Sequence, residues 1–360
     1  MRSDRRELLQ LLGTGLAFSG LAAGARAAAP AGGSAAGGGV PAAAAAGESQ
    51  PPPLAEVKGR VAYVTGGSSG IGLGLVRVLR DAGMKVAMGY IDEAQMTDAL
   101  THFAKDDPDL MTIRHDVTDA DAWPRVADEI ERRFGHLHLL ANNAGVGVDA
   151  AASTGTLKDW QWGLGVNLWG PIHGVHTFVP RMLAHKEPAH IVTTTSLGGL
   201  IPGSGAGVYA VSKAAALMLM EELRIELAAT NIGTSAFLPG GVATNLRNSE
   251  SYRPPALKNS NGNETIRPSG GPKPPTGPLP PGMMDPLQAA RIVLDGIRHN
   301  DLFIMSHPMF RPGVEQRFNA YLESMSDQPL PPNFNAAAVI RTPIYAEEIA
   351  HRRATRPRKV

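Results

Sequence analysis

The stretch that decides the fold reads VAYVTGGSSGIG and spans residues 61–72. Residues 61–64 are apolar and predict a short buried strand, while Leu75, Val76 and Leu79 recur at helical spacing behind the glycines. A glycine-rich turn between a strand and a helix presents backbone amides and a helix N-terminus to a phosphate group. Such a turn can also serve only to tighten the joint, but its place after a first apolar strand favours a dinucleotide-binding site.

The turn and the end of the next predicted strand carry the first candidate contacts to a dinucleotide. At that strand end an acidic residue prefers NAD, whereas an arginine accommodates the 2′-phosphate of NADP. Residues 88–92 read MGYID, so Asp92 comes slightly late and no basic residue is near in the sequence, which favours NAD over NADP. The candidate contacts of this region are Gly66, Ser68, Ser69, Gly70, Ile71, Gly72 and Tyr90.

From Val57 onward, apolar runs typical of strands alternate with helical stretches. The predicted strands are 61–64, 86–88, 111–117, 139–141, 190–194, 234–238 and 302–305. Predicted helices follow the glycine turn up to Gly83 and cover 123–134, 209–230 and 286–298. This alternation implies a parallel sheet covered on both faces. We therefore expect an α/β fold, a single doubly wound Rossmann-type domain over residues 57–325 with a central parallel sheet flanked by helices.

Two regions depart from the alternation. Residues 250–286 are rich in Pro, Gly and Asn, which indicates either a substrate-side lid or a disordered insertion. Residues 326–360 are Pro- and Asn-rich and end in RRATRPRKV, which predicts a loose basic C-terminal tail.

Tyr209 and Lys213 open the long predicted helix and lie four residues apart, on one face. Taken singly they would be a half-buried aromatic residue and a solvated charge. A free phenol has a pKa of about 10, and a neighbouring ammonium favours phenolate, so we expect Lys213 to lower the pKa of Tyr209. Ser196 follows the preceding strand, whose end the sheet topology brings to the start of this helix. The three side chains predict proton transfer to or from an alcohol or carbonyl oxygen.

These residues, with Asn142-Asn143-Ala144-Gly145, Asn167 and Pro239-Gly240, follow in the order and spacing of the short-chain dehydrogenase/reductase family. The chain resembles that family over roughly residues 57–325. The resemblance implies hydride transfer between a nicotinamide cofactor, NAD or NADP, and a small-molecule secondary alcohol or ketone. The alternative is a nucleotide-binding or sensor protein that keeps this fold without turnover.

The resemblance also implies roles for single residues. Tyr209 is similar to the family's general acid/base, and Ser196 to the residue that hydrogen-bonds the substrate oxygen. Lys213 resembles the lysine that lowers the tyrosine pKa and binds the nicotinamide ribose, and Asn167 the asparagine that holds a proton-relay water. Cofactor contacts implied by the same resemblance are Asp116 and Val117 at the adenine, Asn143, Ala144 and Gly145 after the fourth strand, and Pro239, Gly240, Val242 and Thr244 at the nicotinamide.

A narrower likeness rests on residues 178–182, residues 196–199 and Ser306-His307-Pro308. These segments resemble the branch that contains bacterial dehydrogenases of lignin-derived aryl alcohols. The family resemblance further implies a homodimer or homotetramer, with contacts through the helices around 157–185 and 209–230.

The chain begins MRSDRRELLQ, and Arg5-Arg6 ahead of a modest apolar run is typical of a twin-arginine export signal. We expect a signal peptide over residues 1–27, with Ala25-Arg26-Ala27 at the cleavage site, and an Ala/Gly/Pro-rich linker over 28–56. Because that route carries folded proteins, the dinucleotide would be bound before export to the periplasm. The alternatives are an uncleaved anchor helix or an ordinary cytoplasmic enzyme with a chance basic start.

Composition excludes several other functions. With 34 basic and 33 acidic side chains, the formal net charge of +1 offers no broad footprint for nucleic acid. Cysteine is absent, which rules out disulfides and thiolate metal sites. The 11 histidines show no metal-ligand spacing, so no metal site is predicted. The leader's apolar run is short for a span, so no stable membrane span is expected after processing.

Overall fold

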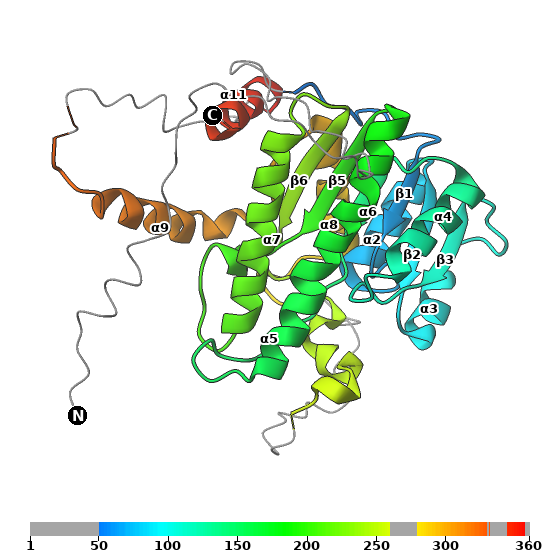
Figure 1. Cartoon of the computed structure of the whole chain (residues 1–360), viewed down its shortest axis with the longest axis horizontal. Helices are drawn as coiled ribbons and strands as arrows, with labels where there is room; N and C mark the ends of the chain where they lie inside the picture. Colours follow the sequence, from blue (N-terminus) through cyan, green and yellow to red (C-terminus); the bar gives the residue numbers. More distant parts are fainter. Residues whose placement is uncertain (1–49, 260–278, 330, 332–343, 357–360) are drawn as a thin grey trace, which may run out of the picture. The chain divides into compact units, whose positions relative to one another are not determined.

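The computed structural model of the protein describes residues 50–259, 279–329, 331 and 344–356. Its centre is a seven-stranded parallel sheet in the order β3-β2-β1-β4-β5-β6-β7 (Figure 1). The strands are β1 (Val61–Val64), β2 (Lys85–Tyr90), β3 (Leu110–Arg114), β4 (Leu139–Asn142), β5 (Ala189–Thr194), β6 (Ile232–Leu238) and β7 (Phe303–Met305). All seven predicted strands are present, and the predicted doubly wound α/β domain is confirmed.

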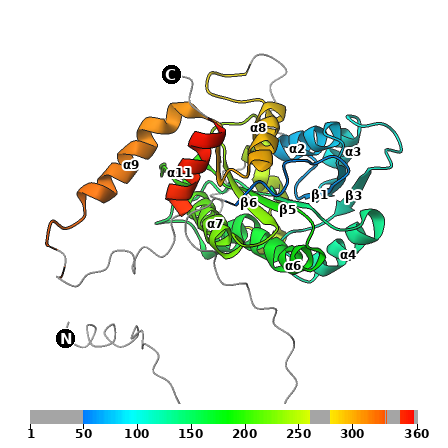
Figure 2. The same cartoon turned by 90° about the horizontal axis from the view of Figure 1, so that it is seen from above.

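Helices cover both faces of the sheet (Figure 2). One layer holds α2 (Gly70–Asp81), α3 (Glu93–Leu100) and α8 (Pro286–His299), and the other holds α4 (Ala122–Phe134), α6 (Gly170–His185) and α7 (Gly207–Glu226). Successive residues of a strand point to opposite faces, so Ala62 and Val64 of β1 join the first layer's core while Val61 and Tyr63 join the second. Among the described helices, none has the length and apolar character needed to cross a bilayer.

The position of the site follows from the strand order. The chain runs outward from β1 through β2 and β3 on one side, and through β4 to β7 on the other. Crossover helices therefore leave the two halves on opposite faces, and a crevice opens outside the carboxyl ends of the strands at this switch point. The glycine turn follows β1 there, Asn143 follows β4, Ser196 follows β5 and Pro239 follows β6.

The folded unit begins earlier than predicted. The linker expected over 28–56 is wrong for residues 50–56, because Gln50 donates from its side-chain amide to the carbonyls of Thr230 and Ile232 at 2.9 and 3.1 Å. Leu54 is fully buried in the core. Gln50 and Leu54 therefore anchor this segment to the domain, although its prolines are typical of a flexible linker. The predicted leader and the rest of the linker lie outside the described residues.

The predicted loose tail over 326–360 is wrong for residues 344–355, which form helix α11 (Ile344–Thr355). Its buried residues Ile344, Glu348 and His351 are four and three apart and so share one helical face. Arg352 of this helix and Arg356 just after it pair with Asp301, which is almost completely buried. The charges that looked like a solvated tail are therefore used to dock the helix beside β7.

Candidate active site

A cavity of about 1280 Å³ lies at the carboxyl ends of the central strands. Sites for one small molecule usually span roughly 300–1,000 Å³, so this one has room for a dinucleotide and a substrate. The predicted site residues that line it are Gly66, Ser68, Ser69, Gly70, Ile71, Asp116, Asn143, Ala144, Gly145, Ser196, Tyr209, Lys213, Pro239, Gly240, Val242 and Thr244. The predicted residues Gly72, Tyr90, Val117 and Asn167 are not in that lining.

The glycine turn fits a pyrophosphate. Gly66 has a φ of +62°, which favours glycine, and a Cβ on Gly72 would lie 2.0 Å from the Gly66 carbonyl oxygen. Because Gly72 has no Cβ, the first turn of α2 can pack directly against the Gly66 carbonyl. Within the described chain, the first turn of α2 holds no acidic residue and the Ser69 side chain does not cap the helix. The N-terminal amides of α2 remain for an anionic ligand.

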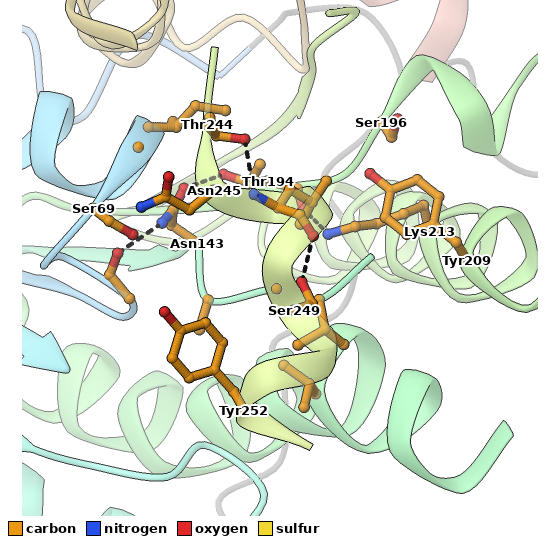
Figure 3. Close-up of a pocket in the computed structure, with 18 of the residues that line it drawn as sticks. Ser69, Asn143, Thr194, Ser196, Tyr209, Lys213, Thr244, Asn245, Ser249 and Tyr252 are labelled. Atoms are coloured by element: carbon orange, nitrogen blue, oxygen red, sulfur yellow. Dashed lines mark hydrogen bonds between the residues drawn. The ribbon is translucent and has the colours of Figure 1, made fainter. Parts of the chain in front are cut away.

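Asn143 ties this turn to the neighbouring strands. Its Nδ2 donates to the carbonyls of Thr65 and Gly66 at 3.2 and 3.3 Å, and its Oδ1 accepts from Thr194 Oγ1 at 3.2 Å (Figure 3). Thr65 Oγ1 in turn accepts from the backbone amides of Asn143 and Ala144 at 2.9 and 3.0 Å. Sequence reasoning gave Thr65 and Thr194 no role, because their partners are distant in the chain.

Ser196, Tyr209 and Lys213 come together as predicted, at the end of β5 and the start of α7 (Figure 3). The Ser196 hydroxyl accepts from the Gly198 amide at 3.0 Å, which holds its oxygen in place. Lys213 Nζ donates to the Thr194 carbonyl at 2.8 Å and lies 5.8 Å from the centre of the Tyr209 ring. The arrangement offers two hydroxyl groups and one buried amine to a ligand in the cavity.

Burial dominates the electrostatics of this group. It lowers the pKa of Lys213 to about 8, since a charged amine is poorly solvated there. Burial also raises the pKa of Tyr209, and the opposing hydrogen bond with Ser196 is the smaller influence. The expected lowering of the Tyr209 pKa is therefore wrong for the chain alone, because burial sets the direction of the shift. A cationic group bound beside the phenol would act in the lowering direction.

Asn167 lies beneath the cavity and holds two of its walls together. It belongs to η1 (Gly165–Trp169), a π-helical turn between α5 (Leu157–Leu164) and α6. Its Oδ1 accepts from the Val146 amide at 2.8 Å, and its Nδ2 donates to the Val146 carbonyl and to Ser212 Oγ at 2.9 and 3.0 Å. The side chain thus joins the segment after β4 to α7. Its part in holding a water stays a prediction.

At the end of β2, a basic residue that the sequence analysis missed stands beside Tyr90. Arg114 of β3 is paired with Tyr90 across the two strands, although it is distant in the sequence. Its guanidinium lies 3.7 Å from Glu93, which also accepts from the Tyr90 hydroxyl at 3.2 Å. Asp92 does not line the cavity, and its carboxylate caps α3 by accepting from the Gln95 amide at 2.8 Å.

The two predicted adenine contacts differ in position. Asp116 lines the cavity, and its carboxylate accepts from the Thr118 amide and hydroxyl at 2.9 and 2.8 Å. Val117 is buried, and its carbonyl accepts from the indole of Trp123 at 3.0 Å. A nucleotide base in the cavity can therefore meet Asp116 directly, whereas Val117 supports the wall from behind.

Both described ends of the region over 250–286 border the cavity, and residues 260–278 lie outside the described residues. Lining residues from η3 (Asn245–Tyr252), η4 (Pro255–Leu257) and the following segments include Ser249, Tyr252, Pro254, Leu257, Pro280 and Met283. Ser249 Oγ accepts from the Gly147 amide at 2.9 Å and so fixes η3 against the segment after β4.

A buried ion pair anchors the same region to α5. Arg253 and Asp159 are 2.5 Å apart with side chains only 3% and 8% exposed, and the guanidinium lies 5.0 Å from the centre of a Trp162 ring. Burial tends to raise the pKa of Asp159, but the hydrogen bonds from Arg253 and Thr156 outweigh it and lower the pKa. Sequence reasoning missed this pair, since nothing local links residues so far apart.

A glycine turn that suits a phosphate, and a tyrosine beside a serine and a lysine in the same cavity, are typical of nucleotide-dependent oxidoreductases on a parallel α/β fold. Among the residues the structure describes, no group of three or more His, Cys, Asp or Glu is placed to hold a metal ion. The short chain dehydrogenase family model matches residues 60–254. The chain belongs to the short-chain dehydrogenase family.

Individual relatives agree with this assignment. The chain is 32% identical over 283 residues to a C alpha-dehydrogenase from Sphingobium sp. strain SYK-6, covering 76% of this chain and 88% of the relative. A short-chain dehydrogenase/reductase from Burkholderia phymatum, solved in complex with NAD, superimposes with a TM-score of 0.68 at 30% identity over 77% of this chain and 99% of the other. The apo form of LigD from Sphingobium sp. strain SYK-6 gives 0.60 at 31% identity, over 75% and 99%.

The geometry at Gly72 predicts a steric effect on nucleotide binding. Gly72→Ala places a methyl group against the Gly66 carbonyl and forces the turn open, so we expect the dissociation constant for NADH to rise at least ~10-fold. Gly203→Ala is the matched control, because a Cβ there meets nothing within 4 Å. Fluorescence titration measures both, and equal affinities in the two variants would contradict this account of the turn.

The burial of Lys213 predicts a pH-dependent stability. Its folded pKa of about 8 lies below the ordinary value of 10.5, so the cost of burying the charge is full below pH 8 and is relieved as the pH rises. Between pH 8 and 10, the free energy of unfolding should rise more steeply in the wild type than in Lys213→Met, by up to about 1.4 kcal/mol per pH unit. Urea unfolding without added nucleotide measures this. Parallel curves would show that Lys213 does not titrate there.

Proposed function

We propose that the protein is a nicotinamide-dependent oxidoreductase that interconverts a secondary alcohol and a ketone. The observation that carries the proposal is the meeting of Ser196, Tyr209 and Lys213 in the cavity that the glycine turn borders. A phosphate-binding turn alone would suit any nucleotide protein. Two hydroxyl groups and a buried amine lie in the same cavity, at the end of β5 and the start of α7. These groups suit proton transfer at a substrate oxygen.

In the proposed reaction the chain binds the substrate oxygen and moves its proton. The hydroxyls of Ser196 and Tyr209 hold the oxygen, and Tyr209 takes the hydroxyl proton in oxidation or returns it in reduction. Lys213 stands one helical turn behind the phenol and supports its charged form when protonated. A bound nicotinamide supplies the hydride acceptor or donor, so that the alcohol loses one hydride from carbon and one proton from oxygen.

We propose NAD rather than NADP as the nucleotide. Glu93 accepts from the Tyr90 hydroxyl and lies 3.7 Å from Arg114, so a carboxylate stands just after β2, where an acidic residue favours NAD. A carboxylate in this place would repel the charge of a 2′-phosphate. The Burkholderia phymatum relative solved with NAD supports the same choice.

The substrate we propose is a bulky aromatic secondary alcohol. Apolar residues form much of the cavity wall, among them Val146, Trp162 and Leu257. Trp162 is almost completely buried and packs with Val146, so this indole is both core and wall. Similarity to a C alpha-dehydrogenase supports an aryl alcohol of the kind that the narrower resemblance implies.

We also propose that the protein acts as a homodimer or homotetramer. Val211 and Met218 of α7 are 45% and 52% exposed and lie two turns apart on one face. Trp169 of η1 is 53% exposed. Large apolar side chains on the surface of α7 and η1 support burial against another copy.

The acid–base role predicts a selective loss of turnover. Tyr209→Phe removes the proton carrier and should lower kcat at least ~100-fold while NADH still binds, because the phenol is not needed for phosphate contact. Tyr321→Phe makes the same change on the exposed helix α9 (Arg311–Glu323) and should leave kcat unaltered. Absorbance at the NADH band, with NAD and NADP tested against aromatic and alicyclic alcohols, measures both. Turnover within a few-fold of wild type in Tyr209→Phe would refute the proposal.

We propose that the twin-arginine leader exports the folded protein to the periplasm, with its dinucleotide bound beforehand. Arg5→Lys with Arg6→Lys should retain the protein in the cytoplasm, because the export route reads the arginine pair. Fractionation followed by immunoblotting measures the location. An unchanged distribution would show that the pair is not an export signal and would favour a cytoplasmic enzyme.

A further inference from the structure

The segment Pro239–Thr244, between β6 and η3, lines the cavity, and its backbone is held from two sides. On one side, Gly241 and Ala243 exchange backbone hydrogen bonds with Met284 at 2.9 and 3.0 Å. These bonds form a parallel bridge between Val242 and Met284. Since the bridge uses the groups flanking Val242, the amide and carbonyl of Val242 itself point away from Met284, and Val242 lines the cavity.

His307 holds the other side of this segment. It follows β7, is 4% exposed and is not among the residues that line the cavity. Its Nδ1 lies 3.0 Å from the Gly240 amide, and its Nε2 lies 3.0 Å from the Gly241 carbonyl oxygen. One imidazole therefore contacts two consecutive residues of the segment, 67 and 66 residues away in the sequence.

The partners of His307 determine its tautomer. A backbone amide can only donate, so Nδ1 must accept from Gly240, and a carbonyl can only accept, so Nε2 must carry the proton. The Ser306 hydroxyl, 2.7 Å from Nδ1, can then only donate to it. The ring is thus a neutral Nε2–H imidazole with both nitrogens in use.

Close packing around His307 leaves room only for a glycine at position 240. A Cβ on Gly240 would lie 2.7 Å from Cγ of His307 and 2.9 Å from the ring of Phe310. Phe310 belongs to η5 (Pro308–Phe310), directly after the histidine. The segment can therefore neither approach the imidazole more closely nor carry a larger residue there.

We propose that His307 is a positioning residue for the nicotinamide half of the dinucleotide. It sets the height of the Gly240–Gly241 peptide, and with Met284 it fixes the direction of the Val242 amide and carbonyl, which point away from the bridge. The inference rests on the proposed function, since it needs a nicotinamide beside this segment. His307 touches neither nucleotide nor substrate and acts through the backbone alone.

The test compares NADH with ADP-ribose, which carries the adenine half and lacks the nicotinamide. His307→Phe removes both hydrogen bonds at similar volume, so we expect the dissociation constant for NADH to rise ~10-fold while that for ADP-ribose stays within about twofold. His307→Asn keeps an acceptor for Gly240 and His307→Gln keeps a donor for Gly241, and each should recover part of the affinity. His176→Phe, the same change at an exposed position of α6, is the matched control and should bind both ligands as wild type does.

Calorimetric titration of the folded variants decides between the readings. The inference is overturned if NADH and ADP-ribose weaken equally, which would mark a structural role, or if His307→Phe binds NADH as tightly as wild type. If His307→Phe does not fold, unchanged NADH affinity in both the Asn and Gln variants overturns it equally. Failure of the wild type to bind either nicotinamide dinucleotide would instead contradict the proposed function itself.

Discussion

The side-chain amide of Asn143 connects the two ends of the cavity. Its nitrogen holds the carbonyls of the glycine turn, and its oxygen accepts from Thr194, whose own carbonyl accepts from Lys213. One short chain of hydrogen bonds therefore runs from the predicted phosphate site to Lys213 of the proposed acid–base group. Because each partner is buried or half-buried, a shift at either end leaves a polar atom unpaired, which couples nucleotide placement to the position of the amine.

Burial sets the chemical state of the site in the chain alone. It lowers the pKa of Lys213 to about 8, so the amine keeps its proton at neutral pH, and it raises that of Tyr209, so the phenol stays neutral. The Lys213 amine lies near the Tyr209 ring, but it donates its hydrogen bond to the Thr194 carbonyl. In the proposed reaction an oxidised nicotinamide would add a second positive charge beside the phenol, and the cavity is large enough to admit it beside a substrate.

Local patterns predicted the parts of the fold and site that local geometry controls. Local sequence patterns predicted the VAYV strand, the glycine turn and the shared face of Tyr209 and Lys213. In each case the residues that are close in sequence are also close in space. Contacts between residues that are distant in the sequence could not be predicted from local patterns. Examples are Arg114 with Tyr90, His307 with Gly240 and Arg253 with Asp159. The pKa of Tyr209 was predicted in the wrong direction, because burial is a property of the whole fold.

The measurement that tests the central claim most directly follows deuterium from a secondary aryl alcohol labelled at its carbinol carbon, oxidised with NAD in ordinary water. The account predicts that the deuterium is recovered by NMR at C4 of the reduced nicotinamide, on one face, while the hydroxyl proton passes to Tyr209 and is lost to solvent. Ketone formation with the deuterium in water, or with none in the dinucleotide, would contradict it.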